Sequence, residues 1–293
     1  MKFPRTLVLG ATGRIGQLLQ RLWPDNADII WQTRQPLPPV ARRPAPPQVW
    51  AQVDPLADPD QLAQMAQGRT VILCLAGVIP GRIPDGGGLD DNMRLAEVAV
   101  ETAAAVGARV LLASSAAVYG SQSGQLTEAS ALQPANDYGR AKAQMEQASA
   151  AQAARLGVDL CALRIGNIAG LDAILGGWRP GFQLDRFADG RSPRRSYIGV
   201  QTLATVLAQL CAAPKLPAAL NIATPESVEM GTLLDAAGLD WTAQPAPDHA
   251  IPEVRLNTHA LTQITPLPSS TAADMVAQWR AVAPQMTQKE TSE

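Results

Sequence analysis

A glycine-rich turn near the start of the chain constrains its fold more than any other feature. The turn has the sequence Gly10-Ala-Thr-Gly-Arg-Ile-Gly16, and it stands between an apolar run at Thr6–Leu9 and a segment with helical spacing at Ile15–Leu22. Glycine lets the backbone turn tightly and come close to a pyrophosphate, while the free N–H groups at the start of the next helix favour negative charge. An ordinary glycine-rich loop could have this composition, but a strand before it and a helix after it predict a dinucleotide site.

Apolar strands alternate with helices over the first 165 residues. The expected strands are Thr6–Leu9, Asp28–Thr33, Gln48–Val53, Val71–Leu75, Val110–Ala113 and Leu160–Leu163. The expected helices are Ile15–Leu22, Pro59–Gln67, Leu89–Val106 and Tyr138–Leu156. This alternation predicts an α/β fold with a doubly wound parallel sheet of the Rossmann type and a small C-terminal substrate lobe.

The chain is expected to divide into two domains. Residues 1–170 should form the dinucleotide-binding Rossmann domain, and residues 199–223 should complete its sheet. Residues 171–198 and 224–293 interrupt the alternation and should form the small substrate-binding lobe. Proline and glycine predict an irregular connection at 35–47 and a mobile loop at 77–88.

Composition argues against several classes of protein. The net charge is −2, so nothing indicates binding to nucleic acid or to a membrane surface. No apolar stretch is long enough to span a bilayer, and no signal-peptide pattern is present. The three cysteines, Cys74, Cys161 and Cys211, lie in apolar runs and are expected to be buried thiols in a reducing, cytoplasmic compartment. His249 and His259 have no spacing typical of a metal site, so no metal is expected.

The end of the second strand indicates which dinucleotide the site takes. NAD-binding chains usually carry an acidic residue there for the ribose 2′-hydroxyl, but this chain has Trp-Gln-Thr-Arg34. Arg34 could pair with a 2′-phosphate and Arg14 could reach the same group, although a solvated surface charge is the alternative for Arg34. NADP(H) is therefore preferred, with NAD(H) as the alternative. Asp54 could accept a hydrogen bond from adenine, or could simply hold a turn before Pro55.

Tyr138 and Lys142 stand one helical turn apart and share a face of their expected helix. A nearby ammonium lowers the pKa of a phenol from about 10, which suits Tyr138 to general acid or base work near neutrality. Ser115 follows the fifth strand and could hydrogen-bond the same substrate oxygen, because ligands of such sheets bind at the carboxyl ends of the strands. A surface Tyr–Lys pair without chemistry is the alternative.

With these features together, the chain resembles the extended short-chain dehydrogenases/reductases of the NAD(P)-dependent epimerase/dehydratase family. The resemblance extends from the first strand to about residue 223. The matching segments are Gly10-Ala-Thr-Gly13-Arg-Ile-Gly16, Cys74-Leu-Ala76-Gly77, Ser114-Ser115-Ala-Ala-Val-Tyr119-Gly120, Tyr138-x-x-x-Lys142, Leu163-Arg164-Ile-Gly-Asn167-Ile-Ala-Gly170, Arg195-Ser-Tyr197-Ile198-Gly-Val200 and Asn221-Ile222-Ala223.

The resemblance implies a role for each matching residue. It implies that Tyr138 is the acid/base, that Lys142 binds the nicotinamide ribose and tunes Tyr138, and that Ser115 orients the substrate oxygen. Asn167 matches a position that contacts the substrate or its phosphate, and Arg195 one that holds the diphosphate in nucleotide-sugar enzymes. A loop-capping asparagine and a surface arginine are the alternatives for these two.

The turn, the strand ends and the resemblance together give one set of expected cofactor contacts. The expected cofactor-binding residues are Gly10, Thr12, Gly13, Arg14, Ile15, Gly16, Arg34, Asp54, Ala76, Gly77, Tyr138 and Lys142. The resemblance also implies a homodimer in which the helices Leu89–Val106 and Tyr138–Leu156 pack into a four-helix bundle.

Departures from the family pattern weaken the case for a nucleotide-sugar epimerase and leave room for a reductase. Gly199 and Thr202 stand where the family often has His and Asp, and the acidic residue after the second strand is missing. These departures favour an NADP(H)-dependent oxidoreductase that acts on a carbonyl or secondary alcohol of a small molecule. The alternative is an NAD(P)-dependent nucleotide-sugar epimerase or dehydratase, and the second alternative is a non-catalytic NADP(H)-sensing protein.

Overall fold

The computed structural model describes residues 3–36, 49–81 and 87–287, so most of the stretch at 35–47 and part of the loop at 77–88 lie outside the described residues. Tertiary contacts divide the chain into two units. The first comprises Met1–Gly120, Leu132–Arg164 and Leu207–Leu220. The second comprises Ser121–Ala131, Ile165–Val206 and Asn221–Glu293.

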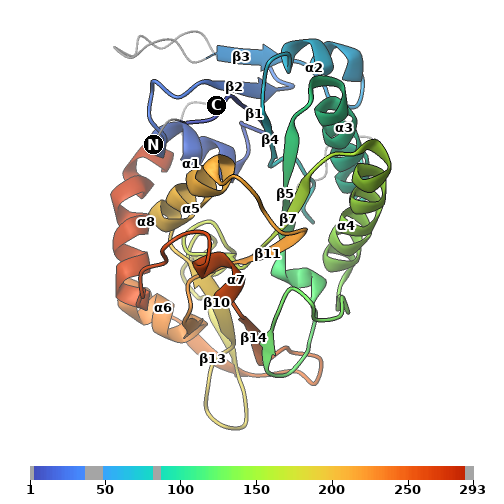
Figure 1. Ribbon diagram of the computed structural model, residues 1–293. Helices are drawn as coiled ribbons and strands as arrows, with labels where there is room; N and C mark the ends of the chain where they lie inside the picture. Colours follow the sequence, from blue (N-terminus) through green and yellow to red (C-terminus); the bar gives the residue numbers. More distant parts are fainter. Residues whose placement is uncertain (1–2, 37–48, 82–86, 288–293) are drawn as a thin grey trace. The chain divides into compact units, whose positions relative to one another are not determined.

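A seven-stranded sheet is the centre of the first unit (Figure 1). Its strands are β1 (Thr6–Leu9), β2 (Ile29–Thr33), β3 (Val49–Gln52), β4 (Val71–Cys74), β5 (Arg109–Ser115), β7 (Leu160–Ile165) and β11 (Ala219–Ile222), of which the last two end in residues of the second unit. Their order is β11-β7-β5-β4-β1-β2-β3. β1 pairs in parallel with β2 and β4, β2 with β3, and β4 with β5. This order confirms the predicted doubly wound sheet, with its switch point between β1 and β4.

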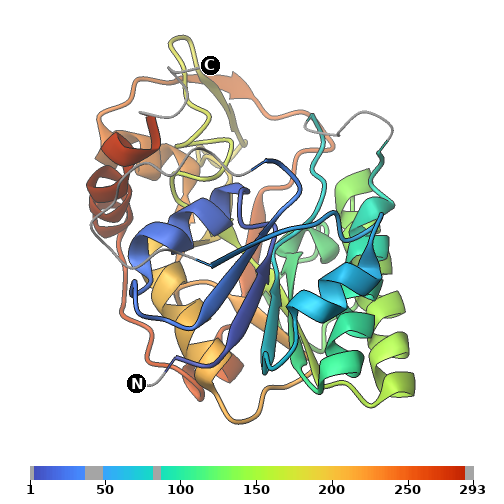
Figure 2. The same cartoon turned by 90° about the horizontal axis from the view of Figure 1, so that it is seen from above.

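Helices cover both faces of this sheet (Figure 2). On one face lie α2 (Pro59–Met65), α3 (Asp91–Val106) and α4 (Asp137–Leu156), with α3 packed along α4, and on the other lies α1 (Arg14–Leu22). Every residue of β1 and β4 is buried, which explains why both strands are continuous apolar runs. The core on the α3 and α4 side includes Leu9, Ile72, Val100, Leu112 and Met145.

The second unit has a sheet of its own. Five strands form it, namely β6 (Gln125–Leu126), β8 (Asn167–Ile168), β10 (Arg194–Ile198), β12 (Ser227–Glu229) and β14 (Glu253–Leu256). A separate parallel pair consists of β9 (Gln183–Arg186) and β13 (Thr242–Pro245). The helices are α6 (Met230–Ala237), α7 (His259–Thr262) and α8 (Ala272–Thr287), while α5 (Val200–Ala212) begins in this unit and ends in the first. Its core contains Tyr197, Leu233, Leu234 and Met275.

The division into units differs from the boundaries expected from the sequence. Residues 121–131, 165–170, 199–206 and 221–223 belong to the second unit, although all were expected in the dinucleotide-binding domain. Strand pairing is the physical reason, because β6 pairs with β14 and β8 pairs with β10. The second unit is therefore assembled from three separate chain segments and is not only C-terminal.

Two kinds of feature are missing from the part of the chain that the structure describes. Within residues 3–36, 49–81 and 87–287, no helix combines the length and apolarity needed to cross a membrane. Within the same ranges, no group of three or more His, Cys, Asp or Glu side chains is placed to hold a metal ion.

Candidate active site

The glycine-rich turn links β1 to α1 through unusually close backbone contacts. Gly10 has a φ of +76°, and a Cβ on it would lie 2.6 Å from the backbone nitrogen of Ala76, just after β4. Gly13 caps the N-terminus of α1, and a Cβ on Gly16 would overlap the carbonyl oxygen of Ala11. Only glycine therefore allows the turn, the helix and the end of β4 to approach one another this closely.

A cavity of about 260 Å³ lies beside this turn, at the carboxyl ends of β1, β2 and β4. Its lining includes six of the residues expected to bind a cofactor, namely Gly10, Thr12, Gly13, Arg34, Ala76 and Gly77. Open α/β sheets bind ligands at the switch point of the strand order, which lies here between β1 and β4. The backbone cradle at Gly10 and this position fit the pyrophosphate and adenosine of a dinucleotide.

The other six residues expected at the cofactor lie outside this lining, and two of them, Tyr138 and Lys142, are described below. Arg14, Ile15 and Gly16 belong to the first turn of α1. One carboxylate oxygen of Asp54 accepts a hydrogen bond of 2.9 Å from the backbone N–H of Leu56. This bond is the turn role that the sequence left open for Asp54, and the oxygen it occupies is directed at the chain's own backbone.

Gln32 holds the glycine-rich turn in place, a role that no pattern in the sequence predicted. This side chain is buried in β2; its oxygen accepts the N–H of Gly10 at 2.9 Å, and its nitrogen donates to the carbonyl of Val53 at 2.7 Å. The turn after β1 is thereby fixed to the end of β3. A glutamine inside the apolar run Ile29–Thr33 was the available signal, because a buried amide needs specific partners.

The structure brings Ser115 and Tyr138 together. Ser115 is the last residue of β5, and its Oγ accepts the N–H of Ala117 at 3.2 Å, at the start of a 3₁₀ turn, η1 (Ala116–Val118). The Tyr138 side chain, in the first turn of α4, is hydrogen-bonded with Ser115. A Cβ on Gly139 would lie 2.5 Å from the carbonyl oxygen of Ala117, so the missing side chain lets α4 begin directly against η1.

Lys142 is buried one turn further along α4. Its Nζ donates to the carbonyl of Ala113 at 3.0 Å and lies 3.7 Å from the sulfur of Met145. Burial lowers the pKa of this ammonium from 10.5 to about 8, and Cys74 and then Glu146 oppose this fall. A Cβ on Gly77 would lie 3.2 Å from the Lys142 Nζ, so the lysine reaches the lining of the cofactor cavity.

The expected electrostatic effect of Lys142 on Tyr138 is wrong for this structure. Burial raises the pKa of the Tyr138 phenol, and the Ser115 hydrogen bond and the positive charge of Arg14 oppose that rise without overcoming it. The physical reason is the burial of the phenol, which outweighs the neighbouring positive charge, while the Lys142 ammonium donates to the Ala113 carbonyl. Tyr138 is therefore protonated near neutrality in this structure, as a proton donor must be.

Asn92 is a second supporting residue whose role the sequence did not predict. It is buried in the first turn of α3; its oxygen accepts the N–H of Val78 at 3.1 Å, and its nitrogen donates to the carbonyl oxygens of Val78 and Leu89 at 3.0 and 2.9 Å. A Cβ on Gly77 would lie 2.7 Å from the Asn92 oxygen. Asn92 therefore fixes the segment after β4 that lines the cavity beside Lys142. The sequence showed only an asparagine near the start of the expected helix Leu89–Val106.

The two residues expected to contact substrate lie in the second unit. Asn167 is in β8, and its side chain is hydrogen-bonded with those of Asp172 and Tyr197, which also bond each other at 2.9 Å. Burial raises the pKa of the Asp172 carboxyl despite these hydrogen bonds. Arg195 donates to the carbonyl oxygens of Arg194 and Ile251, at 2.8 and 2.9 Å. Both expected substrate residues thus have partners within their own unit.

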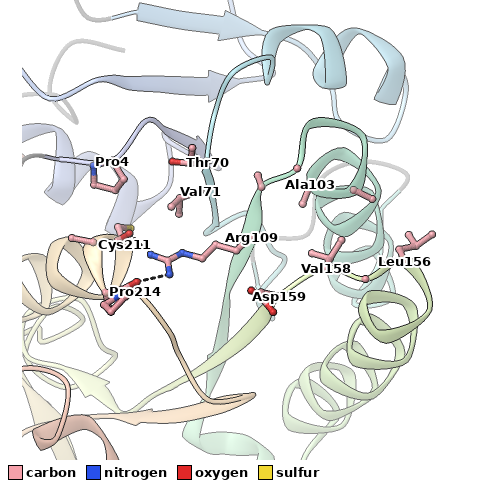
Figure 3. Close-up of a pocket in the computed structure, with 16 residues that line it drawn as sticks. Pro4, Thr70, Val71, Ala103, Arg109, Leu156, Val158, Asp159, Cys211 and Pro214 are labelled. Atoms are coloured by element: carbon pink, nitrogen blue, oxygen red, sulfur yellow. Dashed lines mark hydrogen bonds between the residues drawn. The ribbon is translucent and has the colours of Figure 1, made fainter.

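A larger cavity, of about 490 Å³, lies at the opposite end of the strands (Figure 3). Its lining includes the first residues of β4 and β5 and the end of α5, and none of the residues expected to act in catalysis. Figure 3 shows Arg109 extending towards Cys211 and Pro214. Its guanidinium donates to the carbonyl oxygens of Cys211 and Ala213 and, at 3.4 Å, to that of Leu210. Arg109 therefore caps a helix end, where cations are favoured.

Comparison with known families agrees with this geometry. The model of the NAD dependent epimerase/dehydratase family matches residues 6–176 of this 293-residue chain. The chain belongs to this family. The match confirms the resemblance found in the sequence, and it covers the glycine-rich turn, Ser115, Tyr138 and Lys142. No curated protein sequence matches the chain significantly.

Solved structures of family members have the same fold. A UDP-glucose-4-epimerase from Stenotrophomonas maltophila with bound NAD is 18% identical and has a TM-score of 0.77, covering 98% of this chain and 99% of its own. A UDP-N-acetylglucosamine 4-epimerase from Methanobrevibacter ruminantium is 18% identical, with a TM-score of 0.76 and coverage of 97% and 100%. The dTDP-glucose 4,6-dehydratase DesIV from Streptomyces venezuelae, with NAD bound, is 22% identical, with a TM-score of 0.72 and coverage of 96% and 98%.

Proposed function

We propose that this chain is an NAD(P)-dependent epimerase or dehydratase that acts on a nucleotide sugar, with Tyr138 as the acid/base. One observation carries the proposal: the Tyr138 phenol is hydrogen-bonded with Ser115, one turn from a buried Lys142 that reaches the cofactor cavity. The similar solved structures favour this reading over a net reductase, because they are epimerases and a dehydratase of nucleotide sugars.

The reaction needs a proton and a hydride to leave the same alcohol. The nicotinamide cofactor, when bound, supplies the hydride acceptor and later the hydride donor. Tyr138 takes the hydroxyl proton of a secondary alcohol as its C–H bond breaks, and returns a proton to the oxygen when the carbonyl is reduced. Ser115 holds that oxygen, which becomes a carbonyl in the oxidised sugar.

Lys142 and the backbone glycines hold the reacting groups in place. The Lys142 ammonium next to Gly77 is available to a ribose hydroxyl at the cavity lining. The N–H groups of the glycine-rich turn and the N-terminus of α1 favour the pyrophosphate. Because the Tyr138 phenol is protonated in the structure, it must lose a proton before it can act as the base in the oxidation step.

Two observations favour a second candidate, an NADP(H)-dependent reductase of a carbonyl compound. Arg34 is exposed at the rim of the cavity, where an acidic residue would hold the 2′-hydroxyl of NAD. An arginine there can pair bidentately with a 2′-phosphate, so we propose a preference for NADP(H). A Tyr138 that is already protonated also suits the direct reduction of a carbonyl.

Cofactor release separates the two candidates. We expect the purified epimerase or dehydratase to carry bound cofactor, and to convert UDP-glucose, UDP-N-acetylglucosamine or dTDP-glucose without net change in NAD(P)H absorbance. The products would be identified by NMR. Net NADPH consumption with a carbonyl compound, together with a cofactor-free preparation, would support the reductase instead.

The Tyr138→Phe variant separates both enzymes from a non-catalytic NADP(H)-sensing protein. Either enzyme loses turnover in this variant, whereas a sensor keeps its cofactor-dependent response. A homodimer through α3 and α4 and a cytoplasmic location remain predictions. Light scattering tests the first, and a monomer at micromolar concentration would reject it.

A further inference from the structure

Four polar side chains form a buried network next to the segment that carries Ser115. The proposed mechanism does not use them. We call Ser114, Tyr119, Glu146 and Arg164 the Glu146 network. Each is less than a tenth exposed, and Tyr119 is completely buried. Glu146 accepts two hydrogen bonds from Arg164 through one oxygen, at 2.8 and 3.0 Å, and a hydrogen bond from the Ser114 hydroxyl through the other. Arg164 donates in addition to the Tyr119 hydroxyl at 2.9 Å.

The network holds both ends of the short segment that carries Ser115. Ser114 precedes Ser115 at the end of β5, and Tyr119 follows η1 as its C-terminal cap. Both side chains connect to Glu146 on α4, one directly and one through Arg164 on β7. The segment between them therefore cannot shift relative to α4 without breaking a buried charge-assisted hydrogen bond.

The same carboxylate stands one helical turn after Lys142, on the same face of α4. The titratable groups whose charges act on Lys142 are Glu146 of the same helix and Cys74 of β4. Burial raises the pKa of the Cys74 thiol to about 11, so this thiol is neutral near pH 8. Glu146, itself paired with Arg164, is therefore the anion that acts on Lys142 in the working range of pH.

We propose that the Glu146 network is a set of positioning residues that holds Ser115 against Tyr138 and sets the charge of Lys142. The inference rests on the proposed function, because it assigns catalytic work to these three residues. A purely structural role explains the network less well, since buried ion pairs give little stability relative to well-packed apolar residues of similar volume. The network contains Ser114, the residue before Ser115, and Glu146, one helical turn after Lys142. It therefore fixes the position of Ser115 relative to Lys142.

The composition of the chain allows a test that needs no substrate. The sequence contains four lysines, at positions 2, 142, 215 and 289, and three tyrosines, Tyr119, Tyr138 and Tyr197. NMR of protein labelled with ¹³C in the lysine side chains and the tyrosine rings can therefore follow Lys142 and Tyr138 individually. Lys142→Arg and Tyr138→Phe variants assign the two signals.

Opposite charge changes should move the Lys142 pKa in opposite directions. Glu146→Gln removes the anion and leaves Arg164, so the Lys142 pKa should fall below the wild-type value of about 8 by about one pH unit. Arg164→Gln removes the cation and leaves Glu146, so the pKa should rise by a similar amount. General loosening of the core would instead hydrate Lys142 and raise its pKa in both variants, which would overturn the charge-setting part of the proposal.

The hold on Ser115 is tested through Tyr138. Ser115→Ala removes a hydrogen bond that lowers the Tyr138 pKa, so it should raise that pKa and sets the reference shift. Ser114→Ala and Tyr119→Phe leave Ser115 in place, but each should raise the Tyr138 pKa in the same direction if the network holds Ser115. The matched control is Ser149→Ala, a buried hydroxyl one turn after Glu146 on the same helix, which bonds only the helix backbone and should shift neither pKa.

A double variant separates positioning from stability. Glu146→Met combined with Arg164→Met replaces the ion pair by apolar side chains and should keep the free energy of unfolding near the wild-type value. In this double variant the Tyr138 pKa should nevertheless remain above the wild-type value. Turnover should be at least about tenfold lower than in the wild-type protein. Recovery of the Tyr138 pKa together with stability would overturn the proposal. Because the pKa values are measured on the free protein, their outcome is independent of whether the proposed reaction is correct.

Discussion

The two ends of strand β5 carry different functional groups and serve different purposes. Arg109, at the first residue, points its guanidinium to the carbonyl oxygens that end α5. Ser115, at the last residue, turns the chain into η1 and is hydrogen-bonded with Tyr138. One strand therefore carries a helix-capping arginine at its amino end and the serine that we propose acts in catalysis at its carboxyl end.

The cavities at the two ends of the strands differ in the same way. The cavity at the amino end is the larger, about 490 Å³ against about 260 Å³ at the carboxyl end. Arg109 in this cavity nevertheless donates to backbone carbonyl oxygens, and the cavity lining includes none of the expected catalytic residues. The smaller cavity lies at the switch point of the sheet and combines a backbone cradle with a buried lysine at its lining. We therefore place the candidate site by its position relative to the strand ends and not by cavity volume.

The largest difference between the two ends should come from Tyr138→Phe. Loss of the phenol removes the proton donor, so turnover of the substrate found in the nucleotide-sugar screen should fall by about 10²- to 10⁴-fold. Stopped assays with product detection by NMR would measure it, and the circular dichroism spectrum should not change. Arg109→Met is the control from the opposite end and should keep turnover close to wild type. Activity of Tyr138→Phe within a factor of ten of wild type would remove Tyr138 from the mechanism.

The next largest effect concerns the buried charge of Lys142. Its pKa is about 8 in the folded chain and 10.5 in the reference state. Between these values the unfolded chain holds a proton that the folded chain has released, so this group makes the folded state more stable as the pH rises. The free energy of unfolding of wild type relative to Lys142→Met should therefore increase by up to about 3 kcal/mol between pH 7.5 and 10.5.

Urea unfolding at several pH values would measure this difference. The comparison with Lys142→Met cancels the titration of all other groups to a first approximation. A difference that stays constant over the whole range would show that the ammonium is hydrated, and would contradict its burial at the catalytic end of the sheet.

A smaller effect is expected at the amino end of β5. Arg109→Met leaves helix-end carbonyl oxygens without their charged donor, so the free energy of unfolding should fall by about 1–3 kcal/mol. Denaturant titration would measure the loss, while calorimetry should find unchanged affinity for NADH and NADPH. A change in cofactor affinity would break the contrast between the two ends.

The smallest effect concerns the choice of cofactor. Arg34→Gln removes the charge at the rim of the cavity, so affinity for NADPH should fall about tenfold while affinity for NADH stays constant. Calorimetric titration of both cofactors would measure the ratio. A wild-type protein that prefers NADH would reject the proposed contact between Arg34 and a 2′-phosphate, and would favour the solvated alternative.

Local features of the sequence predicted the first unit well. The glycine-rich turn and the buried strands were found because apolar runs and glycine spacing are local properties. Ser115 was expected just after the apolar run Val110–Ala113, and it is the last residue of β5, which continues two residues beyond that run. The family model also begins at this first strand, at residue 6, and it covers the glycine-rich turn and the buried strands of the first unit up to residue 165.

Features that depend on long-range contacts were missed or were wrong. The two-residue strand β6 is too short to leave a periodic signal, and its partner β14 lies about 130 residues away. The burial of the Tyr138 phenol depends on packing between separate elements, so the sequence could not show that its pKa would be raised. Gln32 and Asn92 bond the backbone of other elements, which no spacing rule reveals.

The amide of Gln32 has a consequence for the rate at which the dinucleotide binds. Because it already joins the N–H of Gly10 to the carbonyl of Val53, the loop that we propose binds the pyrophosphate needs no ordering when the dinucleotide arrives. Rigid receptors lose little conformational entropy on association, and they capture ligands without waiting for a rearrangement. Gln32→Leu should therefore slow association of the dinucleotide more than it speeds dissociation, a signature that stopped-flow fluorescence can resolve.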